Sequence, residues 1–203
     1  VREGDTVDIK RAGDVIPQII SVNLDKRKKG SLKVSLPKRC PSCKNDLVRI
    51  EGEAILRCTA GVDCPAQRIG SLIHFVSRNA LNIDGLGERI IELLVDKKLV
   101  LNFADLFRLD IKDIINLEGF GEKSATNLIK SIQASKDTNL SRFIYSLGIR
   151  EVGEATAMNL ALNFNNISKF LAADEQDFLE INDIGPVASN YIKEFLASDE
   201  NIN

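Results

Sequence analysis

The first part of the chain alternates between apolar and polar positions, which is the period of a β-strand. Residues 6–10 alternate, residues 15–22 form a nearly continuous run rich in β-branched side chains, and residues 32–36 alternate again. These stretches predict three strands, with the charged residues 25–30 as a hairpin tip. Pro17 has no backbone N–H to donate, so we expect it at a sheet edge or a bulge. Three strands make a poor domain, so this part is interpreted as the tail of a β-barrel that begins outside the chain.

Beyond residue 70 the apolar positions recur at the spacing of amphipathic helices. After Gly121 they fall at i, i+3, i+4 and i+7, and the same kind of spacing follows two later glycines. Pro186 suits the first turn of the last of these helices. Asn102 is placed to cap a shorter helix ahead of Gly121. The second part of the chain is therefore predicted to be helical.

A short motif recurs four times in this helical part. The motif has five positions. Apolar residues occupy the first and fourth, a glycine or an acidic residue occupies the third, and a glycine occupies the fifth. The final glycines fall 34, 32 and 32 residues apart, and a predicted helix follows each of them. Each unit thus reads as helix, hairpin, helix. The four copies occupy residues 83–87, 117–121, 149–153 and 181–185.

The glycines of these hairpins suggest a binding site for anions. Gly85, Gly87, Gly119 and Gly121 would let the backbone take positive φ and approach another surface closely. The N–H groups of the turn and of the following helix would then be available to a phosphate group. The alternative is that these glycines only connect the helices of a bundle. Four copies at a nearly constant period favour the phosphate-binding interpretation.

The third and fourth hairpins depart from the first two. They end in Gly153 and Gly185, but Glu151 and Asp183 stand where the earlier copies have glycine. A carboxylate beside a phosphate is unfavourable, so these hairpins are expected to contact a nucleic acid less closely or to serve packing. Lys123 and Arg150, next to the second and third hairpins, are candidate phosphate contacts. Solvated side chains at a helix start or turn remain an equal alternative for both.

All four cysteines of the chain lie in one window with gaps of 2, 14 and 5 residues. A Cys-x-x-Cys turn and a second pair brought in by a hairpin can surround one zinc ion. The hairpin is predicted from strands at residues 47–50 and 54–56, with residues 51–53 as the turn. Four thiolates leave no open position, so the zinc would be structural. The zinc ligands would be Cys40, Cys43, Cys58 and Cys64. The alternative is two disulfides among these cysteines, for which three connectivities are possible.

Composition and charge limit the classes of function. The 203 residues are 44% apolar and 28% charged, as in an ordinary soluble protein of one or two domains. No apolar run approaches the length of a membrane span, and no lipid-anchor motif is present. Met158 is the only methionine, so we expect Val1 not to be a native start and the chain to be part of a longer protein.

The net charge of −2 hides an uneven distribution. Residues 1–39 carry ten Lys and Arg against five Asp and Glu, a balance of +5. Residues 40–69 carry four of each, and residues 70–203 carry thirteen against twenty, a balance of −7. This acidity argues against a nucleic acid held by bulk charge, so any such contact must depend on local geometry. The basic run at residues 25–30 is interpreted as a solvated loop.

Together these motifs resemble the carboxy-terminal part of the bacterial NAD-dependent DNA ligases. The resemblance covers the whole chain: RAGDVIP, the spacing of the four cysteines, HFVSR, IDGLG, ADLF and LGIREVGEATA occur in this order. It implies a multi-domain, mainly α protein with the end of an oligonucleotide-binding (OB-fold) barrel at residues 1–39. A four-cysteine zinc finger at residues 40–69 and a helix-hairpin-helix DNA-binding domain at residues 70–203 would follow.

The resemblance also implies roles for individual residues. Arg11 would contact phosphate near a nick, and Val15 and Ile16 would press into the minor groove against the base pairs there. The zinc would join the barrel to the helical domain. The four hairpins would line the minor groove of an encircled duplex through Gly87, Gly121, Gly153 and Gly185.

The family's catalytic lysine lies in a KxDG motif, which does not occur in these residues, and we expect its nicotinamide-binding and BRCT domains to lie outside this chain. The resemblance implies a parent enzyme that uses NAD and magnesium to seal nicks in double-stranded DNA during replication and repair. It would be a monomeric, nucleoid-associated protein of the bacterial cytoplasm that does not bind membranes. This region is expected to bind neither cofactor and to be inactive alone.

Two other classes of function remain open. One is a non-catalytic zinc and helix-hairpin-helix module of DNA repair or recombination, which would have no reason for the RAGDVIP turn. The other is a protein-interaction bundle with a zinc staple, which would tolerate bulky replacements of the hairpin glycines. The lone His74 is flanked by apolar residues, so a place on a helix surface or at the edge of the core is predicted rather than catalysis.

Overall fold

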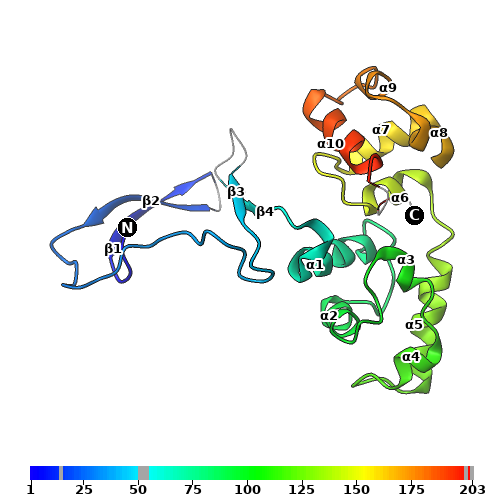
Figure 1. The fold of residues 1–203 in the computed structure, drawn as a ribbon, viewed down its shortest axis with the longest axis horizontal. Coiled ribbons are helices and arrows are strands. Elements are labelled where there is room, and N and C mark those ends of the chain that lie inside the picture. Colours follow the sequence, from blue (N-terminus) through cyan, green and yellow to red (C-terminus); the bar gives the residue numbers. More distant parts are fainter. Residues whose placement is uncertain (14–15, 50–54, 199–200, 202–203) are drawn as a thin grey trace. The chain divides into compact units, whose positions relative to one another are not determined.

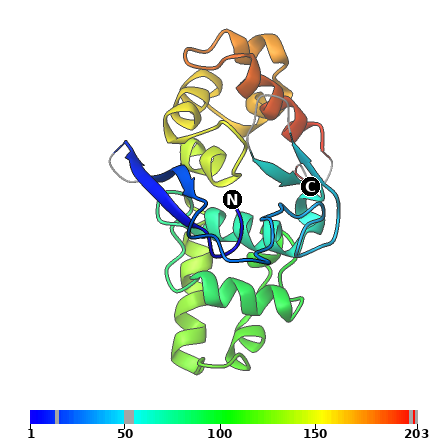
Figure 2. The same cartoon turned by 90° about the vertical axis from the view of Figure 1, so that its left-hand side faces the viewer.

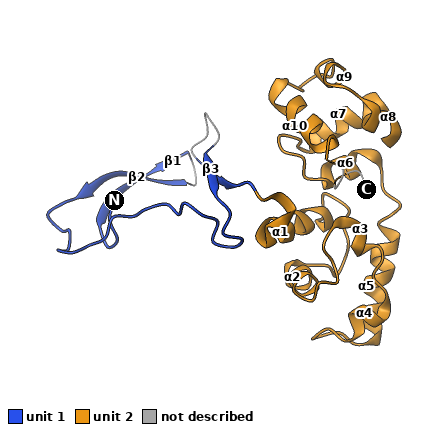
Figure 3. Ribbon diagram, in the orientation of Figure 1, with its two compact units in different colours: residues 1–59 blue, residues 60–203 orange. Residues whose placement is uncertain are grey.

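The computed structural model describes residues 1–13, 16–49, 55–198 and 201, in two compact units (Figure 3). Residues 1–59 form unit 1, whose strands are β1 (Thr6–Ala12), β2 (Ile16–Asn23), β3 (Leu47–Arg49) and β4 (Leu56–Cys58). Residues 60–203 form unit 2. Its helices are a short 3₁₀ turn η1 (Gly61–Asp63), then α1 (Pro65–Val76), α2 (Glu88–Asp96), α3 (Phe103–Leu106), α4 (Ile111–Ile115), α5 (Glu122–Ala134), α6 (Leu140–Ser146), α7 (Glu154–Phe164), α8 (Ile167–Ala172), α9 (Glu175–Leu179) and α10 (Pro186–Leu196).

The first two predicted strands are confirmed as an antiparallel pair, β1 and β2. The register shifts after Asp8, which leaves Ile20 as the extra residue of a bulge. Pro17 lies in β2, which pairs with β1 alone among the described residues, so it is on an edge strand as predicted. Ile9 and Ile16 are 61% and 69% exposed. A hairpin with such exposed apolar side chains fits a sheet that continues elsewhere, and the barrel itself stays a prediction.

The third predicted strand is wrong. Residues 32–36 form no strand, and only Lys33 makes an isolated bridge, to Arg2. Apolar and polar residues alternate at these positions, but no strand in the described part of unit 1 pairs with them. Residues 25–30 are therefore not a hairpin tip. Arg27 instead donates two hydrogen bonds of 2.8 Å to the carboxylate of Asp5, and these hold the pKa of Asp5 at about 2.

The hairpin predicted between the cysteine pairs is present, with its second strand displaced. β3 ends at Arg49, and β4 runs from Leu56 to Cys58 rather than over residues 54–56. Leu47 pairs with Cys58, so the strand carries the third cysteine itself. The predicted turn at residues 51–53 lies outside the described residues.

Unit 2 has two separate hydrophobic clusters. The first collects buried residues from Leu72 to Ile132 and includes stacked rings of Phe75 and Phe103, 4.4 Å between centroids. The second extends from Ile144 to Ile192 around three phenylalanines in mutual edge contact. In Figures 1 and 2, α7–α10 gather at one end of this unit and α2–α5 at the other. The clusters define two tandems, with buried residues from Leu72 to Ile132 in the first and from Ile144 to Ile192 in the second, and each tandem contains two of the four hairpins.

The helical predictions are confirmed in detail. α5, α7 and α10 begin directly after Gly121, Gly153 and Gly185 and bury the faces that the apolar spacing indicated. Asn102 caps α3, accepting from the backbone N–H of Asp105 at 3.0 Å. The predicted fold class, mainly α with four helix-hairpin-helix motifs, is therefore confirmed.

His74 has the packing role that the sequence predicted. It lies in α1, and its Nε2 is 2.8 Å from the carbonyl oxygen of Tyr145, whose ring it also contacts edge-on. A Cβ at Gly148 would come within 3.2 Å of the imidazole, and Gly148 has φ of +65°. The histidine thus packs against a turn where only glycine fits easily.

Candidate metal centre and nucleic-acid interface

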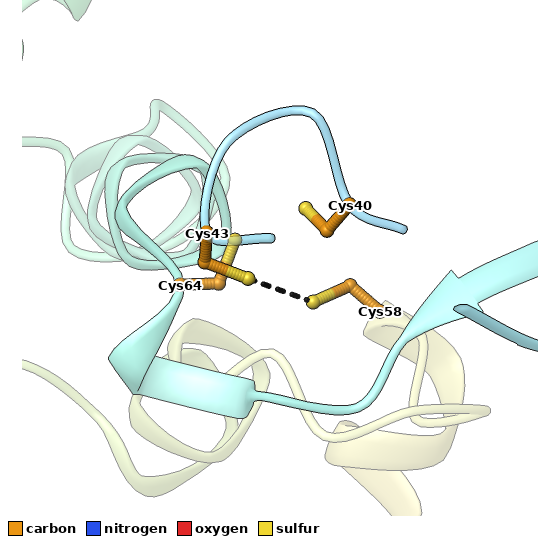
Figure 4. Close-up of side chains that lie close together, drawn as sticks. All are labelled: Cys40, Cys43, Cys58 and Cys64. Atoms are coloured by element: carbon orange, nitrogen blue, oxygen red, sulfur yellow. Dashed lines mark hydrogen bonds between the residues drawn. The ribbon is translucent and has the colours of Figure 1, made fainter. Parts of the chain in front are cut away.

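The four cysteines converge on one point, as predicted for a zinc site. Their Sγ atoms all lie within 4.8 Å of one another, and those of Cys43 and Cys58 are 3.4 Å apart (Figure 4). Four sulfurs at about 2.3 Å from a tetrahedral zinc would be separated by roughly 3.8 Å, so the cluster fits this ion. None of the four forms a disulfide bond, so the disulfide alternative is not observed.

The surroundings of the cluster favour thiolates. Hydrogen bonds from the backbone N–H groups of Cys43 and Ser42 lower the pKa of Cys40 to about 6, although burial opposes this shift. Cys64 immediately precedes α1, whose first N–H groups have no partner within the helix and favour a negative sulfur. Cys40 and Cys64 are buried. A closed set of four thiolates supports a structural zinc rather than a catalytic one.

The four hairpins have the same pattern of burial. In each, the two apolar residues of the motif point into a core, and the final glycine is exposed. The residue directly before the second apolar anchor is exposed in all four as well. Apolar anchors therefore fix every turn to its tandem, while the main chain between them faces outward. The anchors are Ile83 and Leu86, Leu117 and Phe120, Ile149 and Val152, and Ile181 and Ile184.

The backbone of the four hairpins is also alike, which the sequence did not indicate. Gly85 and Gly119 have φ of +85° and +86°, and Glu151 and Asp183 have +62° and +66°. The third and fourth hairpins thus keep the left-handed turn without glycine. Their departure from the motif is confined to the side chain, which places a carboxylate on the exposed tip. Weaker contact between these tips and a nucleic acid stays a prediction.

These left-handed positions give a stability prediction. Gly119→Ala should destabilise unit 2 by about 1–2 kcal/mol, because an L side chain is strained at this φ even though no atom lies within 4 Å of the added Cβ. Glu151→Gly should be neutral or stabilising, since it relieves that strain at an entropic cost of about 0.5–1 kcal/mol. Urea denaturation followed by circular dichroism measures both changes.

The control is Gly121→Ser, at a glycine with extended φ of −123° and equally open surroundings. Gly121 is the N-cap of α5 and serine is a preferred N-cap residue, so this change should leave the unfolding free energy unchanged or raise it. An equal loss in Gly119→Ala and Gly121→Ser would show that the left-handed turn is not what requires glycine.

The final glycines differ from the left-handed ones. Gly87, Gly121, Gly153 and Gly185 are the N-cap residues of α2, α5, α7 and α10, with extended backbones, and a Cβ added at any of them would meet no atom within 4 Å. Neither φ nor packing among the described residues requires glycine here. A side chain at any of these four positions would extend outward from the protein, into the space from which a ligand would approach.

Cationic side chains are found beside the first two hairpins. The predicted Lys123 is exposed at the second position of α5. Arg89 takes the same position in α2 and is exposed, with Glu118 of the second hairpin 3.9 Å away. Arg89 is not among the residues predicted from the sequence, although alignment of the repeats on their final glycines places it in register with Lys123. The equivalent residues of the later hairpins are Ala155 and Val187.

Arg150 occupies a different environment from Lys123. Its guanidinium lies over the ring of Tyr191, 4.6 Å from the centroid, and only 28% of the side chain is exposed. Glu151 is 3.9 Å away. This arginine connects the third hairpin to α10, so packing accounts for its position, and phosphate contact stays a prediction.

The first hairpin borders an open hollow of about 560 Å³. Its wall includes the main chain of Gly85 and Gly87 together with the exposed Arg78. Ile73 and Val76 of α1 form an apolar part of the lining. A glycine turn, a helix start and a cation thus share one concave surface with the carboxylates of Asp84 and Glu88, which oppose the approach of a phosphate.

The residues predicted to act near a nick lie in unit 1. Arg11 is exposed near the end of β1, and Ile16 is exposed at the start of β2. Gly13, between them, has φ of +63°. Val15 lies outside the described residues. Arg11 and Ile16 are thus brought to the same end of the β1–β2 hairpin, and their contacts with DNA stay predictions.

Fold and site together define a class: a zinc-finger protein with tandem helix-hairpin-helix domains. Comparison with protein-family models agrees. Residues 39–66 match the NAD-dependent DNA ligase C4 zinc finger domain, residues 77–134 a SAM-like helix-hairpin-helix tandem, and residues 142–203 a helix-hairpin-helix motif. The last two segments overlap the two tandems, and each contains two of the four hairpins.

Comparison with curated proteins extends the match to the whole chain. It is 49% identical over 201 residues to a DNA ligase of Saccharophagus degradans, covering 99% of this chain and 30% of the relative. It is 50% identical over 202 residues to a DNA ligase of Hahella chejuensis, covering 100% of this chain and 30% of that relative. The resemblance to the NAD-dependent DNA ligases is confirmed, and the chain spans about 30% of the length of these relatives.

Among the described residues, none of the helices combines the length and the apolar character that crossing a membrane requires.

Proposed function

We propose that this chain is the DNA-binding region of an NAD-dependent DNA ligase and holds duplex DNA through its hairpins. The supporting observation is the fourfold repetition of one turn, with buried anchors, an exposed main chain and a glycine N-cap that nothing in the described chain requires. Helix starts and glycine turns bind phosphate without reading bases. Binding should therefore be independent of sequence.

The contacts are proposed to lie in the minor groove, made by Gly85, Gly87, Gly119 and Gly121 with Arg89 and Lys123 beside them. Both cations are exposed at the second position of a helix that follows a glycine hairpin. The later hairpins would approach through Gly153 and Gly185, with the carboxylates of Glu151 and Asp183 weakening their grip. Arg11, Val15 and Ile16 would add contacts at the nick.

For the parent protein we propose the sealing of nicks in duplex DNA, with NAD as the source of AMP and magnesium as the metal. The 5′-phosphate at the nick would be activated as an AMP adduct, from which the 3′-hydroxyl displaces AMP. This chain has no KxDG lysine, so it would supply the grip on the duplex and none of the transfer chemistry. We propose that it acts as a monomer on bacterial nucleoid DNA.

The test is equilibrium binding of the zinc-loaded chain to nicked, intact and single-stranded DNA over a series of salt concentrations. The logarithm of duplex affinity should fall linearly with the logarithm of salt concentration, with a slope of about 0.9 per phosphate engaged. A preference for nicked duplex would add the β1–β2 hairpin to the site. Incubation with NAD, magnesium and nicked duplex, free of host ligase, should give no ligated product.

A folded, zinc-loaded chain that binds no duplex at low salt would contradict the proposed grip. Ligation by this chain would contradict the assignment of chemistry to other parts of the parent protein. The alternative of a non-catalytic repair or recombination module is not favoured, because the relatives matched over the whole chain are DNA ligases.

A further inference from the structure

The two tandems of unit 2 have separate buried clusters, and polar contacts together with one ring contact join them. Among the described residues, no buried side chain belongs to both hydrophobic clusters. The first cluster ends at Ile132 and the second begins at Ile144. In Figures 1 and 2 the yellow-green α6 lies between the helices of the two ends. Whatever fixes the angle between the tandems must therefore lie at this junction.

Arg142 of α6 makes the most directional contact of the junction. Its Nε donates to the carbonyl oxygen of Ala80 at 2.7 Å, and its Nη2 donates to that of Arg78 at 2.6 Å. Ala80 is fully buried. The fork of one guanidinium thus holds two carbonyls of the loop that leads into the first hairpin. A lysine, with one nitrogen, could not reproduce this geometry.

Two further contacts join the same segments. The side-chain amide of Asn79 donates to Glu154 Oε1 at 2.7 Å, and Glu154 is the first residue of α7, directly after the third hairpin. The imidazole of His74 contacts the carbonyl of Tyr145, also in α6. Residues 74–80 are thereby connected to residues 142–154 at three points. These points lie just before the first hairpin and on both sides of the third.

From this geometry we propose that Arg142 is a positioning residue, which holds the two tandems as one rigid DNA-binding surface. The inference rests on the proposed function, in which hairpins of both tandems engage the same duplex. Two sites at a fixed separation bind one rigid ligand more tightly than two sites whose separation varies. Arg142 would then raise duplex affinity without contacting phosphate.

The test compares Arg142→Lys and Arg142→Gln in the whole chain, with Arg108→Lys and Arg108→Gln as matched controls. Arg108 is an exposed arginine that pairs with Asp105, three residues away in the chain. Residual dipolar couplings measured by NMR report the relative orientation of the tandems without DNA. The parent and both controls should fit one alignment tensor for the two tandems. Both Arg142 variants should require two.

Duplex affinity should fall roughly tenfold in Arg142→Lys and Arg142→Gln alike, while the salt slope stays that of the parent chain. Retention of one tensor and of parent affinity in Arg142→Lys would overturn the proposal. So would a loss confined to Arg142→Gln with a slope reduced by about 0.9, which marks a direct phosphate contact. Asn79→Ala, a change at an exposed side chain, should loosen the tandems in the same direction and more weakly.

These readouts separate the inference from the proposed function. If the parent chain bound no duplex, the proposed function would fail, and the dipolar couplings would still decide whether Arg142 orients the tandems. If the parent bound duplex and the couplings of Arg142→Lys were unchanged, the inference alone would fail.

Discussion

Replacement of Cys43 or Cys58 by serine is expected to abolish stable zinc binding and to unfold the segment between Cys40 and Cys64. Even an outer-shell partner of a metal contributes about 10–100-fold in affinity, so loss of a ligand should lower it by more than about 100-fold. Structural zinc contributes on the order of 10 kcal/mol to small metal-dependent folds, and β3 and β4 comprise only three residues each. The described residues of this segment form no hydrophobic core that would supply a comparable stabilising free energy in place of the zinc.

Metal content per chain and hydrogen exchange of the β3–β4 amides measure the two effects. Ser42→Ala, inside the same turn, is the matched control and should keep zinc and protection. The helices of both tandems should survive in the cysteine variants, because their clusters are built from other residues. A Cys43→Ser chain that retained one tightly bound zinc and full protection would contradict the four-thiolate site.

The double variant Gly87→Asp, Gly121→Asp is expected to lose duplex binding while remaining folded. Both glycines are N-caps with extended backbones, and nothing lies within 4 Å of a Cβ at either position. Aspartate is a preferred N-cap residue, so α2 and α5 should be as stable as before or more so. Two carboxylates beside phosphate should reduce affinity on the order of 100-fold or more, because juxtaposed like charges cost several kcal/mol.

Gly87→Asn, Gly121→Asn is the matched control, with the same shape, the same capping ability and no charge. Its affinity should lie between that of the parent chain and that of the aspartate variant. Thermal melting should rank the aspartate and asparagine variants at or above the parent. Unchanged duplex affinity in a folded aspartate variant would show that these hairpins are scaffolding, as in a protein-interaction bundle.

The sequence carried enough information to predict the elements that depend on local patterns. Apolar spacing after Gly121 predicted α5 because a helix face repeats within a few residues. The gaps between Cys40, Cys43, Cys58 and Cys64 predicted the cluster for a similar reason, since four soft ligands in one short window can reach one ion. Both predictions involve neighbours in the chain, and both are confirmed.

The strand at residues 32–36 shows where local pattern is insufficient. A strand exists only if another strand supplies its hydrogen bonds, and alternation says nothing about the partner. The pairing of Arg27 with Asp5 was missed for the same reason, since it joins residues 22 positions apart. Arg150 was predicted to contact phosphate, with a solvated side chain as an equal alternative, and only the fold places it over Tyr191.

The repeat itself was determined by the sequence, and the equivalence of its copies by the tertiary structure. Glu151 and Asp183 break the glycine pattern, yet their backbones take the same left-handed turn as Gly85 and Gly119. Buried anchors on both sides of each turn hold that conformation, and burial is a property of the packed tandem rather than of five residues. The junction at Arg142 is likewise invisible in the sequence, because its acceptors are main-chain carbonyls that every residue possesses.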